Sequence, residues 1–82
     1  MKREQIIENL KDILQSASDD PDVLSKCTED AKLQTELGLT SVNMLYTVIA
    51  IEETFDIRFD DVTVTSFDTF GDVIGYIERK LT

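Results

Sequence analysis

Apolar side chains recur every three or four positions in two stretches of this chain, the spacing that aligns them on one face of an α-helix. In residues 4–17 the repeating positions are Ile6, Leu10, Ile13, Leu14 and Ala17. Towards the end of the chain the same spacing joins Phe67, Phe70, Val73, Ile74, Ile77 and Leu81. An apolar face has to be buried against another element, so the pattern predicts helices over residues 4–17 and 69–81 that pack together.

A further helix is predicted over residues 41–55, and it is apolar on more than one side. Its apolar positions are Val42, Met44, Leu45, Val48, Ile49, Ile51 and Phe55. A short helix in water buries one face, so we expect some of these side chains to remain exposed.

The predicted fold class is all-α, with residues 1–82 forming a single small domain. We expect a bundle of three main helices plus a short helical turn at residues 60–64, which together make a four-helix bundle. Between the first and second helices, residues 18–40 are predicted to form a long loop that holds the only proline and the only cysteine. A loop of this length has to be pinned to the core. The side chains expected to pin it are Val23, Leu24, Leu33 and Leu37.

Charge and residue types exclude several classes of function. The chain has 8 basic and 17 acidic side chains and no histidine, which gives a net charge of −9. This charge repels phosphate backbones, so no nucleic-acid partner is expected. One cysteine without histidine leaves neither a usual zinc site nor a Ser-His or Cys-His pair, so we expect no metal and no enzyme activity.

Hydropathy gives no sign of a membrane segment. The longest apolar run, residues 48–51, is far shorter than the ~20 residues of a membrane span. The first residues are charged and polar where a signal peptide would begin its apolar stretch. We therefore expect a cytoplasmic protein without a membrane span, and we expect it to be a monomer.

The segment Glu36-Leu37-Gly38-Leu39-Thr40-Ser41-Val42 joins the loop to the second helix. Gly38 permits a sharp backbone turn, and Leu37 can anchor that turn in the core. Ser41 falls at the start of the helix, where a serine commonly caps a free backbone N–H. Thr40 fits the capping role equally well, so these residues alone leave the role of Ser41 open.

From Leu33 to Ile77 the sequence resembles the acyl carrier protein family. The family signature is a leucine-glycine pair three residues before a serine that opens the second helix, here Leu37-Gly38 and Ser41. The resemblance continues through Val42, Leu45, Val48, Ile51-Glu52-Glu53, Phe55-Asp56-Ile57 and Phe70-Gly71-Asp72-Val73-Ile74-Gly75-Tyr76-Ile77. It implies that Ser41 carries a 4′-phosphopantetheine arm, attached from coenzyme A by a phosphopantetheinyl transferase. The thiol of that arm then holds an acyl group as a thioester.

The resemblance also implies roles for residues around Ser41. In this family the helices can part to shelter an acyl chain, and the candidate lining residues are Leu45, Val48, Phe59, Val62, Phe67 and Ile74. The candidate contacts for the transferase and for acyl-loading and acyl-transferring enzymes are Thr40, Val42, Tyr46, Ile49, Glu52 and Glu53. Static core packing is the alternative role for the lining set, and core burial is the alternative for Val42 and Ile49.

Three positions depart from the pattern of fatty-acid carriers. Thr40 replaces the usual aspartate before the serine, and Asn43 and Tyr46 stand where acidic residues are common. The surface near Ser41 is therefore less charged, which predicts a specialised, discrete acyl carrier for a fatty-acid, polyketide or related biosynthetic pathway. Two alternatives stay open: an aminoacyl, peptidyl or D-alanyl carrier, and a helical interaction module that has lost the arm.

Overall fold

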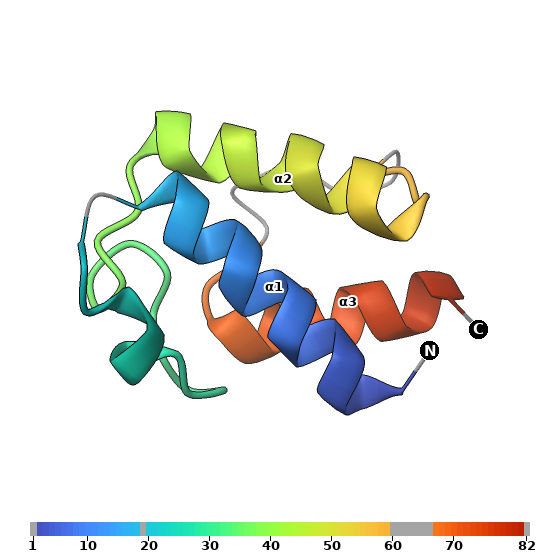
Figure 1. Cartoon of the computed structure of the whole chain (residues 1–82), viewed down its shortest axis with the longest axis horizontal. Coiled ribbons are helices and arrows are strands. Elements are labelled where there is room, and N and C mark those ends of the chain that lie inside the picture. The colour runs from blue at the N-terminus through green and yellow to red at the C-terminus, as the bar shows by residue number, and fades with distance from the viewer. Residues whose placement is uncertain (1, 19, 60–66, 82) are drawn as a thin grey trace.

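Three α-helices and one short 3₁₀ helix make up the regular structure in the computed structural model, which describes residues 2–18, 20–59 and 67–81 (Figure 1). The elements are α1 (Arg3–Ala17), the 3₁₀ helix η1 (Val23–Lys26), α2 (Ser41–Phe55) and α3 (Phe70–Leu81). The all-α prediction is confirmed. Each helix begins and ends within one residue of its predicted position, because the three-and-four spacing of buried side chains extends over the whole of α1 and α3.

Two details of the helix count differ from prediction. The turn predicted at residues 60–64 lies outside the described residues, and the described part of the chain holds three α-helices rather than four. The additional short helix, η1, lies in the loop, where no regular element was predicted; a single 3₁₀ turn is too short to show a helical repeat in sequence. Within the described ranges, no helix has the length and apolar composition to cross a membrane.

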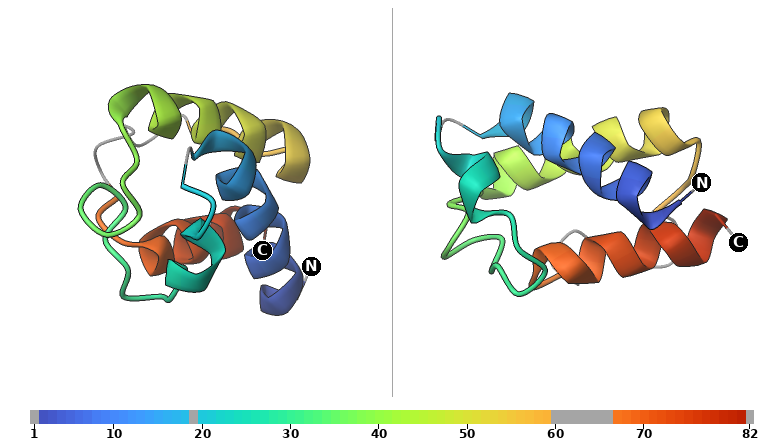
Figure 2. Two further views of the ribbon diagram at one scale, coloured as in Figure 1. Left: turned by 60° about the vertical axis from the view of Figure 1, so that its left-hand side comes forward. Right: turned by 60° about the horizontal axis from the view of Figure 1, so that its bottom comes forward.

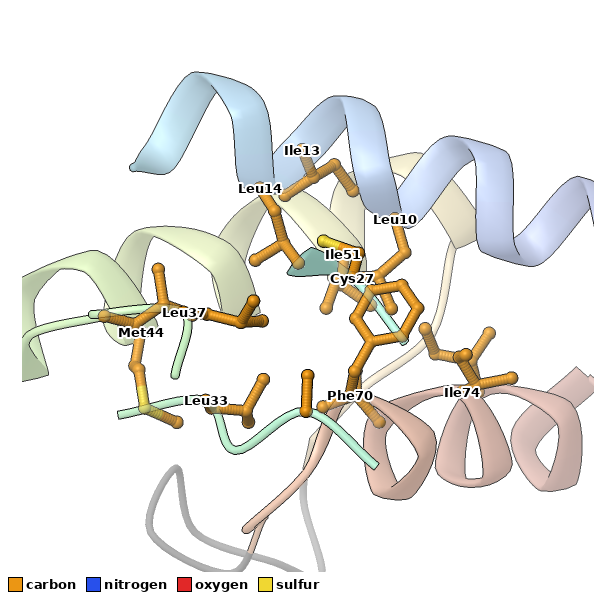
Figure 3. Packing of buried hydrophobic residues seen from close by; sticks show 14 of the residues in the cluster. Leu10, Ile13, Leu14, Cys27, Leu33, Leu37, Met44, Ile51, Phe70 and Ile74 are labelled. Carbon is orange, nitrogen blue, oxygen red and sulfur yellow. The ribbon is translucent and has the colours of Figure 1, made fainter. Parts of the chain in front are cut away.

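The helices share one apolar interior. α1 packs against both α2 and α3 (Figure 1), and the loop lies at the end of the bundle where α2 and α3 begin (Figure 2). Figure 3 shows side chains from the helices and from the loop meeting in this interior. Its buried members are Ile6, Leu10, Ile13, Leu14, Val23, Cys27, Ala31, Leu33, Leu37, Leu39, Met44, Ile51, Phe55, Phe70, Val73, Ile74 and Ile77. Burial of this apolar surface is the main force that holds so small a domain together.

The long loop is pinned largely as predicted. Val23, Leu33 and Leu37 are buried, but Leu24 is exposed, so the prediction for Leu24 is wrong. Successive residues of a 3₁₀ helix point about a third of a turn apart, and with Val23 facing the core its neighbour faces solvent. Cys27 is buried as well and its Sγ donates to the Val23 carbonyl at 3.2 Å; burial raises the pKa of this thiol and keeps it protonated.

Backbone hydrogen bonds fasten the loop to the start of α3. The Leu33 N–H donates to the Asp68 carbonyl at 2.9 Å, and the Phe70 N–H donates to the Ala31 carbonyl at 2.9 Å. The Gly71 N–H donates to the carbonyl of Glu29, also at 2.9 Å. The loop is therefore a structural part of the bundle, held by groups some forty residues away in sequence.

A reciprocal pair of side-chain hydrogen bonds caps the start of α3. Asp72 Oδ2 accepts from the Thr69 N–H at 3.1 Å and from the Asp68 N–H at 3.0 Å, while the Asp72 N–H donates to Thr69 Oγ1 at 3.2 Å. The Thr69 and Asp68 N–H groups lower the pKa of Asp72. Because the folded pKa lies below the unfolded one, this cap stabilises the fold above the unfolded pKa, and the effect is lost as the pH falls through the folded pKa.

The two glycines of α3 are predicted to respond oppositely to alanine. A Cβ at position 71 would lie 2.9 Å from the Glu29 carbonyl oxygen, whereas a Cβ at position 75 would meet no atom within 4 Å. Gly71→Ala should therefore lower the free energy of unfolding by about 1–3 kcal/mol. Gly75→Ala should raise it by about 0.5–1 kcal/mol, because alanine is the better helix former. Urea unfolding followed by circular dichroism measures both, and equal effects of the two substitutions would contradict the close loop contact.

Candidate functional site

The turn before α2 brings the chain out of the core to the surface. Gly38 has a φ of 68°, in the left-handed region that favours glycine, and the leucines on either side of it are buried. The Leu39 N–H donates to the Leu33 carbonyl at 3.0 Å, which fixes the second leucine. Leu37 was predicted as an anchor; Leu39 was not. The two anchors leave residues 40–42 exposed at the start of α2.

Thr40, rather than Ser41, caps α2. Thr40 Oγ1 accepts from the Asn43 N–H at 3.1 Å, and Asn43 Oδ1 accepts from the Thr40 N–H at 3.1 Å. This reciprocal pair is a capping box with asparagine in place of the usual glutamate or glutamine. The sequence left the choice between Thr40 and Ser41 open, and it gave no role to Asn43, although the Thr-x-x-Asn spacing was the available signal.

Ser41 is the first residue of α2, it is exposed, and its hydroxyl makes no hydrogen bond with any other described residue. The N–H groups of Ser41 and Val42 are likewise without a hydrogen-bond partner among the described residues. A helix start with free N–H groups favours a negative charge through the helix dipole, by about 0.3–1 kcal/mol. The position therefore combines an accessible nucleophilic oxygen with surroundings that suit a phosphodiester.

An exposed row of apolar side chains runs along α2 from the residue after Ser41. We call it the apolar stripe; its members and exposed fractions are Val42 (76%), Leu45 (53%), Tyr46 (50%) and Ile49 (48%). The spacing of three, four and seven places all four on one helical face. Leu45, which was predicted to line an acyl cavity, lies on this exposed face, and its role stays a prediction. The core face of α2 carries Met44, Thr47, Ile51 and Phe55. Because the helix is apolar on more than one side, the sequence does not show which of its sides faces the core.

The acidic residues at the far end of α2 differ in their surroundings. Glu53 is exposed, whereas Glu52 is half-buried and its Oε2 accepts from the Phe59 N–H at 2.9 Å. Glu52 thus holds the segment after α2 in place. Asp56, which ends the helix, has a left-handed φ of 55°.

A small apolar cavity of about 20 Å³ lies between the helices, enough for about one water-sized sphere. Its lining comes from all three helices, the loop and the segments that flank residues 60–66: Leu10, Leu14, Leu33, Leu39, Met44, Thr47, Val48, Ile51, Phe59, Phe67, Phe70 and Val73. Val48, Phe59 and Phe67 are predicted lining residues found there. Ile74 is fully buried in the core but is not part of this lining, and Val62 lies outside the described residues.

Two aromatic lining residues pack on a third ring from α3. The ring centroids of Phe59 and Phe67 are 5.7 Å apart, and those of Phe59 and Tyr76 are 4.8 Å apart. The Tyr76 hydroxyl donates to the Arg58 carbonyl at 3.3 Å. These contacts pack the two lining residues Phe59 and Phe67 against α3.

The described part of the chain is thus a helical bundle that presents an exposed serine at the start of a helix. A family model described as a phosphopantetheine attachment site matches residues 4–77. The fold and the site thus define a phosphopantetheine-binding carrier domain.

Individual relatives agree with this class. An acyl carrier protein of Thermotoga maritima is 34% identical over 79 residues, covering 96% of this chain and 95% of the relative. An acyl carrier protein of Exiguobacterium sp. is 30% identical over 82 residues, covering 99% of this chain and 100% of the relative. An acyl carrier protein of Aster yellows witches'-broom phytoplasma is 34% identical over 77 residues, covering 92% of this chain and 96% of the relative. The chain belongs to the acyl carrier protein family. Its cofactor is the family's 4′-phosphopantetheine, and the named relatives are carriers rather than enzymes.

Substitutions at the start of α2 should separate the cap from the free hydroxyl. Thr40→Ala removes the capping oxygen and should lower the free energy of unfolding by about 1 kcal/mol. Ser41→Ala removes a hydroxyl that no other described residue contacts through a hydrogen bond, and it should change the free energy of unfolding by less than about 0.5 kcal/mol. Thr40→Ser keeps the cap and is the control. Chemical unfolding measures all three, and a cost for Ser41→Ala as large as that for Thr40→Ala would show that Ser41 is engaged as a cap.

Proposed function

We propose that Ser41 is the attachment residue for 4′-phosphopantetheine and that the protein carries acyl intermediates for a dedicated fatty-acid, polyketide or related biosynthetic pathway. The observation that carries the proposal is the exposed Ser41 hydroxyl, which has no partner among the described residues because Thr40 and Asn43 cap the helix between them. When attached, the group supplies a thiol that holds an acyl chain as a thioester. A cytoplasmic location and a monomeric state stay predictions.

The chain's own residues present the serine and do not activate it. Ser41 needs no histidine beside it, because the phosphopantetheinyl transferase would supply the base that takes the serine proton. The start of α2 favours the resulting phosphodiester through its dipole and through the free N–H groups of Ser41 and Val42. The protein thus serves as a substrate for the transferase and for the enzymes that load and unload the arm.

The apolar stripe of α2 supports the proposal that the protein works with a dedicated set of partner enzymes. The stripe begins one residue after Ser41, and the side chains of Thr40, Asn43 and Tyr46 on either side of the serine carry no charge. Charged side chains appear only towards the end of α2, at Glu52 and Glu53, and part of the Glu52 carboxylate is already bonded to the Phe59 N–H. We infer that partners dock chiefly through apolar contact beside the arm, with Glu53 supplying steering charge at the edge.

Attachment of the arm tests the proposal. The purified protein is incubated with coenzyme A and a broad-range phosphopantetheinyl transferase, and its intact mass is measured. We expect the mass to rise by one arm in the wild type and in Thr40→Ser, and not to change in Ser41→Ala. An unchanged mass of the wild type with several transferases, or a gain that persists in Ser41→Ala, would overturn the proposal.

The cargo is tested on protein purified from its own cells. The acid released from the arm by mild base is identified by mass spectrometry. A fatty or polyketide acid supports the proposed pathway class, and an amino acid would replace it with aminoacyl or peptidyl transfer.

Docking through the apolar stripe predicts a specific kinetic pattern. Ile49→Ser should raise the KM of the transferase for this protein about fivefold, because it removes an apolar contact worth about 1 kcal/mol. Leu24→Ser is the matched control, because Leu24 is an exposed apolar residue on η1, outside the stripe. Added salt should change the wild-type KM by less than Ile49→Ser does. A KM that responds strongly to salt and not to Ile49→Ser would show that charge, and not the stripe, governs docking.

A further inference from the structure

Asn43 lies two residues after Ser41 and makes a contact that capping does not require. Besides its two hydrogen bonds with Thr40, its side-chain Nδ2 donates to the Ala17 carbonyl at 2.8 Å. Ala17 is the last residue of α1, where carbonyls no longer have an intrahelical partner. The half-buried amide of Asn43 therefore connects the end of α1 to the beginning of α2.

This link is the one hydrogen bond that joins α1 and α2 within the described residues. The rest of their interface is apolar packing from residues such as Leu10, Leu14 and Ile51. Apolar contacts are not directional, whereas a hydrogen bond fixes both distance and angle. The Asn43–Ala17 bond thus constrains both the position and the orientation of the first turn of α2 relative to α1.

The chemistry of the site explains why the side chain is an asparagine. One side of the group has to accept from the Thr40 N–H, and the other side has to donate to the Ala17 carbonyl. A carboxylate of the same shape accepts on both sides and would place an oxygen against the Ala17 oxygen. The asparagine amide accepts the one hydrogen bond and donates the other at the same time.

We propose that Asn43 is a positioning residue for the modification of Ser41: its amide holds the first turn of α2 against the end of α1 and so fixes where the Ser41 hydroxyl is presented to the transferase. The inference rests on the proposed function of Ser41. Asn43 does not touch the reacting atoms and acts through the placement of the helix start. Losing the link lets the helix start take several positions, of which a fraction is competent, and the apparent affinity of the transferase falls by that fraction.

Three variants separate positioning from capping and from charge. Asn43→Asp keeps the acceptor for the Thr40 N–H, loses the donor and adds a negative charge. Asn43→Ala loses the donor without adding charge and leaves the Thr40 Oγ1 half of the cap in place. Asn9→Asp is the matched control, because it makes the same chemical change at the other asparagine of the chain, in the middle of α1.

The experiment measures KM and kcat for arm attachment by a phosphopantetheinyl transferase, at a temperature where unfolding curves show every variant to be folded. Asn43→Asp and Asn43→Ala should each raise KM by about three- to tenfold and leave kcat within about twofold. Asn9→Asp should match the wild type. In ¹⁵N relaxation, the order parameter of the Ser41 N–H should fall in both Asn43 variants, which a loss of global stability alone would not cause.

Each of the other possible results would overturn the inference and would point to a different cause. A raised KM in Asn43→Asp alone assigns the effect to charge, and a raised KM in Asn43→Ala alone assigns it to the cap. Unchanged KM in both variants, with the wild type modified normally, rejects the positioning role and leaves the attachment at Ser41 intact. A wild type that takes up no arm rejects the proposed function itself.

Discussion

The reciprocal hydrogen bonds between Thr40 and Asn43 are the interaction on which the proposed site depends. A helix start has free N–H groups, and a serine among them ordinarily turns its hydroxyl towards one of them. Here Thr40 and Asn43 form the cap, and Ser41 stays at the surface with no hydrogen bond from its hydroxyl to the described part of the chain. The same asparagine reaches the end of α1, so capping and placement of the helix start come from one side chain.

The interior of the bundle is arranged to support this surface. Leu37 and Leu39 anchor the turn before α2 on both sides of Gly38, and the loop that carries them is bonded in turn to the start of α3. The cavity between the helices has room for about one water-sized sphere, whereas ligand pockets usually measure about 300–1,000 Å³. A carrier of long acyl chains therefore has to open this interior, where Phe59 and Phe67 pack against Tyr76 of α3.

The sequence predicts the helices well because their signal is local. Regular spacing of buried residues locates α1 and α3, and the segment up to Ser41 locates the start of α2. The rotation of α2 was not predictable, because apolar residues on more than one side leave its core face undefined; Leu45, which the family resemblance placed in the lining set, lies on the exposed face. The burial of Cys27, Ala31 and Leu39 was missed too, since it depends on how the long loop packs against the rest of the bundle, which no local pattern encodes.

Part of the site is likewise predictable from the sequence and part of it is not. The Leu-Gly-x-x-Ser spacing singles out Ser41, but the sequence cannot choose between a capping and a free hydroxyl, since that depends on which side chain turns towards the helix. The most direct measurement is fragment mass spectrometry of the protein purified from its own cells. We expect the phosphopantetheine mass on the fragment containing Ser41 and on no other serine or threonine. A bare Ser41 in cells that modify other carriers, or an arm on a different hydroxyl, would contradict it.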